Sequence, residues 1–159
     1  WIAPIGPNLN EFENDLCTYT GAKYSVGLTS GTAAIHLALK ILGIGQGDVV
    51  LVQSFTFCGS ANPVIYSGAT PVFIDSERLT WNMCPKALRE SLEDLDKKGL
   101  IDKVKAIIPV HLYGMPAKMD EISFIASNYR IPIVEDAAES IGSSIRNQQT
   151  GTFGEMGVY

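Results

Sequence analysis

The chain has 159 residues, which is enough for one domain with a substantial core, and its formal net charge is −5. The acidic balance argues against a nucleic-acid partner, because no excess of Lys and Arg is available to neutralise phosphates. Apolar residues make up 46% and charged residues 18% of the chain, a composition typical of globular proteins.

The cysteines and histidines of the chain further limit the kinds of site that it can form. Cys17, Cys58 and Cys84 are widely spaced and form no C-x-x-C pair, which favours reduced thiols in a cytoplasmic protein over a disulfide framework or a zinc site. With two histidines and no clustered ligands, we expect no metal site. No apolar run approaches the ~20 residues of a membrane span, and no signal peptide opens the chain. We therefore expect no membrane partner.

Short β-rich runs alternate with helical patterns along the chain. The expected strands are residues 24–29, 49–52, 71–75, 104–110, 132–135 and 156–159. The expected helices are residues 10–20, 33–42, 85–98 and 119–129. The third of these helices has Pro85 in its first turn and Gly99 just after its end, the usual asymmetry of helix termini.

The alternation predicts the fold class. Nearly continuous apolar strands separated by helices indicate an α/β domain with a mostly parallel sheet, covered on both faces. Such sheets bind ligands at the carboxyl ends of their strands. The chain begins at Trp1 without Met and ends at Tyr159 inside an expected strand. We therefore expect residues 1–159 to be a single partial domain of a longer protein.

Residues 28–34 (LTSGTAA) follow an expected strand and open an expected helix. Small residues at a helix N-terminus let backbone N–H groups approach an anion, and Thr32 can add a hydroxyl donor. An ordinary Ser or Thr helix cap explains the same residues without any ligand. The spacing matches neither the dinucleotide fingerprint nor a Walker loop.

Glu135 and Asp136 end the expected strand at residues 132–135. Side chains alternate along a strand, so the two carboxylates point to different faces, and one can meet a ligand while the other pairs within the fold. A buried carboxylate needs a compensating cation, and a protonated pyridine nitrogen is one. Asp136 can equally cap a short helix that follows.

Two further candidates follow expected strands. Residues 54–62 (SFTFCGSAN) place aromatic side chains beside small ones, where a flat ring could stack, although such aromatics are more often part of the core. His111 follows the strand that ends at Val110 and could be an acid/base, a ligand contact or a structural histidine.

Taken together, these motifs resemble a known family, the DegT/DnrJ/EryC1/StrS nucleotide-sugar aminotransferases, which are fold-type-I pyridoxal-phosphate enzymes. The segments that carry the resemblance are residues 30–39, 47–50, 56–57, 68–75, 110–114, 135–139 and 151–154. The resemblance covers essentially the whole chain. It implies a three-layer α/β/α fold, the large cofactor-binding domain of fold-type-I aminotransferases in part, with the C-terminal small domain absent.

The resemblance also implies roles for individual residues. Gly31, Thr32 and Ala33 would hold the cofactor phosphate. Phe57 would stack on the pyridine ring, and Asp136 would pair with the pyridine nitrogen.

Other positions depart from the family or lie at the edge of the motifs. Glu139 stands where relatives often carry Gln or His near the phenolic oxygen of the ring. Residues 2–7 resemble a segment that lies near the substrate in the family. The Schiff-base lysine lies beyond Tyr159, because no lysine of this chain matches its position. No catalytic residue is therefore expected within the chain, apart from support by His111.

The function implied is amino transfer from an amino acid, L-glutamate, to a nucleotide-linked keto sugar in polysaccharide synthesis, by a homodimer. Two alternatives stay open: a dehydratase of the same family with histidine in place of the lysine, and a non-catalytic relative that binds pyridoxal phosphate or a sugar nucleotide. A nucleotide-binding α/β module of another kind is disfavoured by the missing Gly-rich fingerprints.

Overall fold

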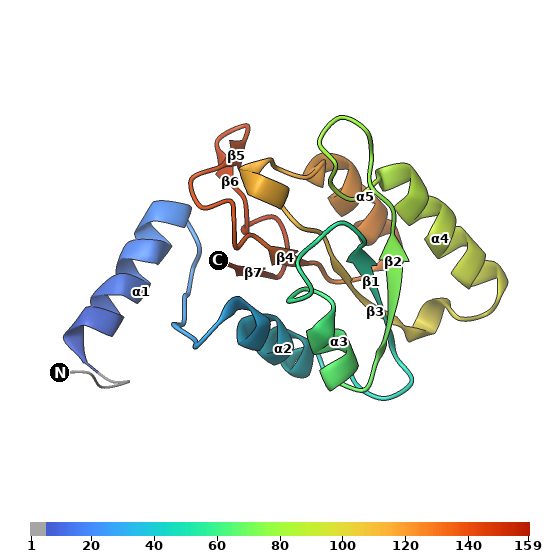
Figure 1. Cartoon of the computed structure of the whole chain (residues 1–159), viewed down its shortest axis with the longest axis horizontal. Coiled ribbons are helices and arrows are strands. Elements are labelled where there is room, and N and C mark those ends of the chain that lie inside the picture. Colours follow the sequence, from blue (N-terminus) through green and yellow to red (C-terminus); the bar gives the residue numbers. More distant parts are fainter. Residues whose placement is uncertain (1–5) are drawn as a thin grey trace.

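The computed structural model describes residues 6–159, and Figure 1 shows their arrangement. The helices are α1 (Pro7–Thr20), α2 (Gly31–Ile41), α3 (Asn62–Tyr66), α4 (Pro85–Lys97) and α5 (Met119–Tyr129). The strands are β1 (Val49–Gln53), β2 (Thr70–Ile74), β3 (Val104–Ile108), β4 (Val134–Asp136), β5 (Ser144–Ile145), β6 (Gln148–Gln149) and β7 (Met156–Val158). Two short 3₁₀ turns cover Ile101–Lys103 and Leu112–Gly114.

A parallel sheet in two linked parts is formed by β1, β2, β3, β4 and β7, whereas β5 and β6 pair antiparallel in a separate ribbon. One part has the order β2-β1-β3, and the other pairs β4 with β7, with every pairing in both parts parallel. Parallel bridges from Ile107 to Ile133 and from Val110 to Asp136 join β3 to the β4 segment. The carboxyl ends of β1, β3 and β4 therefore meet at one edge of the sheet.

Helices cover both faces of this sheet. On one face α2 and α3 pack on Val50, Val52 and neighbouring strand residues. On the other face α4 and α5 pack on a core that contains Leu51 and Ile107. Successive residues of β1 thus enter opposite cores, as the pleat of a strand requires. The expected three-layer α/β/α architecture with a mostly parallel sheet is confirmed (Figure 1).

Helix boundaries follow local chemistry. The Ser30 side chain accepts a hydrogen bond from the Ala33 N–H and so caps α2. Pro85 occupies the first turn of α4, where a missing N–H costs nothing. Gly21 ends α1 in the left-handed conformation that glycine adopts without strain.

One expected strand is wrong. Residues 24–29 form no strand, although their composition is β-rich. The segment lies along α1: Ser25 Oγ donates to the Glu13 carbonyl (2.6 Å), and the Gly27 N–H donates to Glu13 Oε1 (2.8 Å). With its polar groups bound to a helix and Tyr24 and Val26 exposed, the segment joins no sheet.

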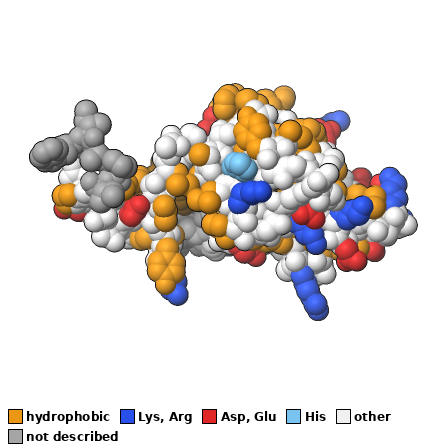
Figure 2. Space-filling view, turned by 90° about the horizontal axis from the view of Figure 1, so that it is seen from below, with side chains coloured by type: hydrophobic (Ala, Val, Ile, Leu, Met, Phe, Trp, Pro, Cys, Tyr) orange, Lys and Arg blue, Asp and Glu red, His pale blue; other side chains and the backbone are white. Residues whose placement is uncertain are grey.

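The surface is mixed. Figure 2 views the molecule from the side of α2 and α3, where hydrophobic side chains gather in groups and Lys and Arg are spread singly. Exposed apolar side chains on these two helices are Leu37, Ile41, Ile65 and Tyr66. No helix among residues 6–159 is long and apolar enough to cross a membrane. Of the expected substrate-proximal segment at residues 2–7, positions 2–5 lie outside the described residues.

Candidate functional site

Several predicted residues converge on the turn that follows β1. A β-carbon placed on Gly59 would lie 2.9 Å from Thr32 Oγ1 and 3.0 Å from Phe57 Cδ1. The next residue, Ser60, donates a hydrogen bond to Asp136 Oδ2 (2.5 Å). The start of α2, the turn after β1 and the end of β4 therefore meet at one place, the edge where parallel sheets bind ligands.

Asp136 is the most unusual group at this edge. Its residue surface is only 8% exposed, yet no cationic side chain among residues 6–159 forms an ion pair with it. Its partners are the Ser60 hydroxyl and, at 3.3 Å, the Ala138 N–H of its own turn. The structure therefore leaves lone pairs on a buried carboxylate available to a cation.

The neighbouring carboxylate, Glu135, points the other way and is fully used. Its Oε1 accepts the N–H groups of Phe153 and Gly154, both at 2.6 Å. Its Oε2 contacts the Gly151 N–H and His111 Nε2, both at 2.9 Å. Glu135 is thus the carboxylate that pairs within the fold, and contact of Asp136 with a ligand stays a prediction.

His111 is buried in the core. Its Nε2 meets Glu135, and its Nδ1 accepts the Ala117 N–H at 3.0 Å. Both ring nitrogens are therefore occupied within the described chain, and the side chain contacts the site through Glu135.

Glu139 is exposed and lies at the same edge. Its Oε2 accepts the N–H of Tyr113 at 2.6 Å. Tyr113 has a φ of 53°, a conformation that non-glycine residues adopt at a cost. Glu139 therefore stabilises the turn after β3.

The N-terminus of α2 offers open donors. The Ala33 N–H is bound by the Ser30 cap, but the N–H groups of Gly31 and Thr32 have no acceptor among the described residues. A helix N-terminus with two open N–H groups and a nearby hydroxyl favours an anion. Gly31 also lies against the end of β7, because its β-carbon would be 3.6 Å from Val158 Cγ1.

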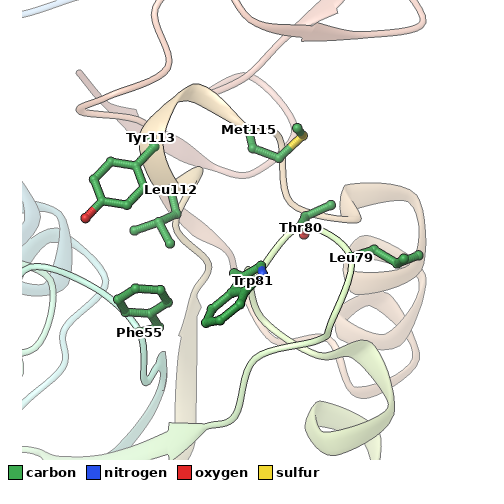
Figure 3. Close-up of a pocket in the computed structure, with 7 residues that line it drawn as sticks. All are labelled: Phe55, Leu79, Thr80, Trp81, Leu112, Tyr113 and Met115. Atoms are coloured by element: carbon green, nitrogen blue, oxygen red, sulfur yellow. The ribbon is translucent and has the colours of Figure 1, made fainter.

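Phe57 is 77% exposed and borders the same turn, so its ring is open to a ligand. A second aromatic surface lies close by. Figure 3 shows a pocket of about 430 Å³, called here the aromatic pocket, whose lining residues come from three loops. They are Phe55, Leu79, Thr80, Trp81, Leu112, Tyr113 and Met115.

A buried amide pair holds the aromatic pocket in place. Gln53 Nε2 donates to Asn82 Oδ1, and the Asn82 amide donates to the Met115 carbonyl at 2.7 Å. Asn82 Oδ1 also accepts the Leu112 N–H at 3.0 Å. Because both amides are fully buried, these bonds fix the loops after β1, β2 and β3 against one another.

Glu77 stabilises the turn that carries Trp81. Burial alone would raise its pKa, but hydrogen bonds from the Thr80 hydroxyl, from the N–H groups of Leu79 and Thr80, and from the Lys118 ammonium together lower the pKa to about 2. The turn therefore depends on an ionised carboxylate.

These features define an α/β/α domain whose candidate ligand site lies at the carboxyl edge of a parallel sheet, between an open helix N-terminus and a buried acid. The model of the DegT/DnrJ/EryC1/StrS aminotransferase family matches residues 1–159, and the chain belongs to this family.

Individual relatives agree with this assignment. The chain is 51% identical over 159 residues to EpsN of Bacillus subtilis (strain 168), provisionally named a pyridoxal phosphate-dependent aminotransferase. The aligned region covers all of this chain and 40% of EpsN. The chain is 40% identical over 159 residues to GDP-perosamine synthase of Caulobacter vibrioides, covering 41% of that protein. The chain thus spans about two fifths of the length of these curated relatives.

A solved structure extends the likeness to the fold. The crystal structure of a DegT DnrJ EryC1 StrS aminotransferase from Brucella abortus matches with a TM-score of 0.91 and 39% identity. The match covers 96% of this chain and 41% of that one. The fold is therefore part of the cofactor-binding domain of fold-type-I aminotransferases, as expected.

Sequence reasoning missed three residues of this site. Ser60, which binds Asp136, and Gly59, whose missing β-carbon leaves space beside Thr32 and Phe57, lay within the segment 54–62 but received no role. Thr56, whose Oγ1 lies 2.6 Å from Ser60 Oγ, was also left without one. The available signal was the run of small residues beside Phe55 and Phe57, which includes Thr56, Gly59 and Ser60.

Proposed function

We propose that the full-length protein is a pyridoxal-phosphate-dependent aminotransferase that passes an amino group from L-glutamate to a nucleotide-linked keto sugar. The observation that carries the proposal is Asp136, a nearly buried carboxylate that no cationic side chain of residues 6–159 neutralises. A buried charge of this kind needs a cation, and a protonated pyridine nitrogen supplies one.

The residues present fit this cofactor. The open N–H groups of Gly31 and Thr32, with the Thr32 hydroxyl, would hold the phosphate at the start of α2. The Ala33 N–H is bound by the Ser30 cap, so Ala33 would border the phosphate with its small side chain. The Phe57 ring would stack on the pyridine, and Gly59 leaves the space between Thr32 and Phe57 open. When bound, pyridoxal phosphate supplies the carbon that carries the amino group and a ring that withdraws electrons.

Within this scheme each residue has a physical task. Asp136 would pair with the ring nitrogen and favour its protonated form. Glu139 would lie near the phenolic oxygen, where an acidic side chain can accept or share a proton. His111 supports the site through Glu135, which holds residues 151–154 in place.

The remaining parts of the reaction lie outside residues 1–159. The lysine that binds the cofactor covalently would follow Tyr159, and the small domain would close over the substrate. Relatives named GDP-perosamine synthase support a nucleotide sugar as the acceptor. The product would enter polysaccharide synthesis.

We further propose a cytoplasmic homodimer without nucleic-acid or membrane partners. The three cysteines are free thiols, which suits a reducing compartment. The exposed apolar side chains of α2 and α3 offer surface that a second copy can bury. Sedimentation of the full-length protein would reveal a monomer if the dimer is wrong.

The test of the activity is a half-reaction in the full-length protein loaded with pyridoxal phosphate. L-Glutamate should be converted to its 2-oxo acid with one equivalent of amine retained on the protein, and a nucleotide-linked keto sugar should then be aminated. The variant Asp136→Asn should bind the cofactor more weakly and lose most turnover. Loss of water from the sugar without amination would identify a dehydratase, and ligand binding without turnover would identify a non-catalytic relative.

A further inference from the structure

Ser60 is a fully buried hydroxyl between two other polar groups. Its Oγ lies 2.5 Å from Asp136 Oδ2 and 2.6 Å from Thr56 Oγ1. Asp136 is 76 residues away in sequence, so this contact ties the turn after β1 to the end of β4.

The direction of the hydrogen bonds follows from the proton inventory. An ionised carboxylate only accepts, so the single Ser60 proton must point to Asp136. The Ser60 oxygen is then the acceptor for Thr56, whose hydroxyl has one proton to give. The other acceptor for that proton, the Phe57 carbonyl, lies farther away at 3.2 Å. The chain of donation therefore runs from Thr56 to Ser60 to Asp136.

This chain has two consequences for Asp136. The bond that Thr56 donates to Ser60 strengthens the one that Ser60 donates to the Asp136 carboxylate. The bond also holds Oδ2, which leaves Oδ1 with only the 3.3 Å contact from the Ala138 N–H. The same turn carries Phe57 and Gly59, so the ring-stacking face and the acid are set by one segment.

We propose that Ser60, ordered by Thr56, is a positioning residue that holds Asp136 oriented toward the ring nitrogen of pyridoxal phosphate. This inference rests on the proposed function. It adds Thr56 and Ser60 to the site as residues that act on the cofactor through Asp136.

The test compares two ligands, pyridoxal phosphate and its 1-deaza analogue, in which a C–H replaces the ring nitrogen. Dissociation constants are measured spectroscopically on the full-length protein. Ser60→Ala should weaken binding of pyridoxal phosphate about tenfold, the effect of one hydrogen bond to a charged group. Binding of the analogue, which offers Asp136 nothing to pair with, should change less than about twofold.

Ser140→Ala is the matched control. Ser140 is also buried and hydrogen-bonded, to Thr150 Oγ1 at 2.9 Å, but it has no contact with Asp136. It should affect both ligands by the same factor. Thr56→Val keeps the shape of the side chain and should weaken pyridoxal phosphate binding less than Ser60→Ala does. The effect of Thr56→Val should disappear in the Ser60→Ala background, because its partner is gone.

Equal effects of Ser60→Ala on the two ligands would overturn the inference, as would no effect on either. Asp136→Asn could remove the tighter binding of pyridoxal phosphate over the 1-deaza analogue while Ser60→Ala does not. The proposed function would then stand, and the proposed role of Ser60 and Thr56 would be wrong. A wild-type protein that binds pyridoxal phosphate and the analogue equally, with Asp136→Asn silent, would overturn the proposed role of Asp136 itself. Should Ser60→Ala fail to fold, Thr56→Val alone decides, through the same ligand comparison.

Discussion

Glu135 and His111 form a pair without solvent contact, joined by Nε2 and Oε2 at 2.9 Å with both side chains fully buried. Because Nδ1 accepts the Ala117 N–H, the ring must carry its proton on Nε2 and donate it to Glu135. The backbone N–H at Nδ1 thus sets the tautomer of His111. At Nε2 the ring supplies one of the N–H groups that Glu135 accepts, and all of these donors are N–H groups.

Glu135→Gln should be strongly destabilising. An amide has one acceptor oxygen, so its NH₂ group must face either the N–H pair of Phe153 and Gly154 or that of Gly151 and His111. His111 cannot relieve the conflict, because moving its proton to Nδ1 places it against the Ala117 N–H. At about 1–3 kcal/mol for each orphaned buried donor, we expect a loss of about 2–5 kcal/mol.

Thermal unfolding of the full-length protein measures this loss, with Glu155→Gln as the control. Glu155 Oε2 also accepts a backbone N–H, from Ile133 at 2.6 Å, but the side chain is exposed and an amide oxygen can replace it. Similar melting temperatures for the two variants would contradict the burial argument.

The sequence predicted the layers better than it predicted the contacts. The apolar runs of β1 and β3 predicted strands of a sheet covered on both faces, because such runs are typical of buried parallel strands. Residues 24–29 misled because β-rich composition says nothing about whether a partner strand exists, and here Glu13 takes the polar groups. The five-residue helix α3 was missed, because it is too short to show a period.

The candidate site was also predictable only in part from the sequence. Asp136 and Thr32 were found because they follow strands or open a helix, positions at which α/β sheets place ligands. The Ser60 contact to Asp136 spans 76 residues, and no local pattern encodes such a pairing. The strained turn at Tyr113, supported by Glu139, was equally invisible, because only the fold brings those two residues together.

Gly59→Ala should weaken cofactor binding without unfolding the protein. Gly59 does not have a positive φ, so its backbone accepts alanine, but the new β-carbon would meet Thr32 Oγ1 at 2.9 Å and Phe57 Cδ1 at 3.0 Å. One of the two side chains must move, and both face the proposed cofactor. We expect the dissociation constant of pyridoxal phosphate to rise by about tenfold or more, as a loss of about 1.4 kcal/mol or more would give.

Gly45→Ala is the matched control, because its β-carbon would approach nothing closer than the Ser67 carbonyl at 3.9 Å. It should leave cofactor affinity unchanged. Unchanged affinity in Gly59→Ala as well would mean that Thr32 and Phe57 are not held against the ligand.

Phe57→Ala should separate binding from stability. The ring is 77% exposed, so its removal costs little packing, and we expect the free energy of unfolding to change by less than about 0.5 kcal/mol. Loss of an aromatic contact worth about 0.5–1.5 kcal/mol should weaken pyridoxal phosphate binding about two- to tenfold.

Phe55→Ala is the comparison, because Phe55 packs on Trp81 with ring centroids 5.9 Å apart and belongs to the aromatic pocket. If Phe55→Ala reduces cofactor affinity more than Phe57→Ala does, the assignment of the stacking ring is wrong.

Acid should release the turn that carries Trp81 only at a pH below the range in which an ordinary carboxyl is protonated. The pKa of Glu77 is lowered from 4.5 to about 2, so the folded turn binds its proton more weakly than the unfolded chain does. The stabilising contribution is therefore complete above pH 4.5 and is lost as the pH falls toward 2.

In full-length protein labelled with 5-fluorotryptophan, the ¹⁹F resonance of Trp81, assigned through Trp81→Phe, should stay constant down to about pH 4.5 and shift only below it. Glu77→Gln cannot accept all the hydrogen bonds that the carboxylate accepts, so its Trp81 resonance should be displaced already at neutral pH and should lose the acid transition. A wild-type resonance that moves with a midpoint near 4.5, the value of an unperturbed carboxyl, would show that Glu77 does not hold this turn.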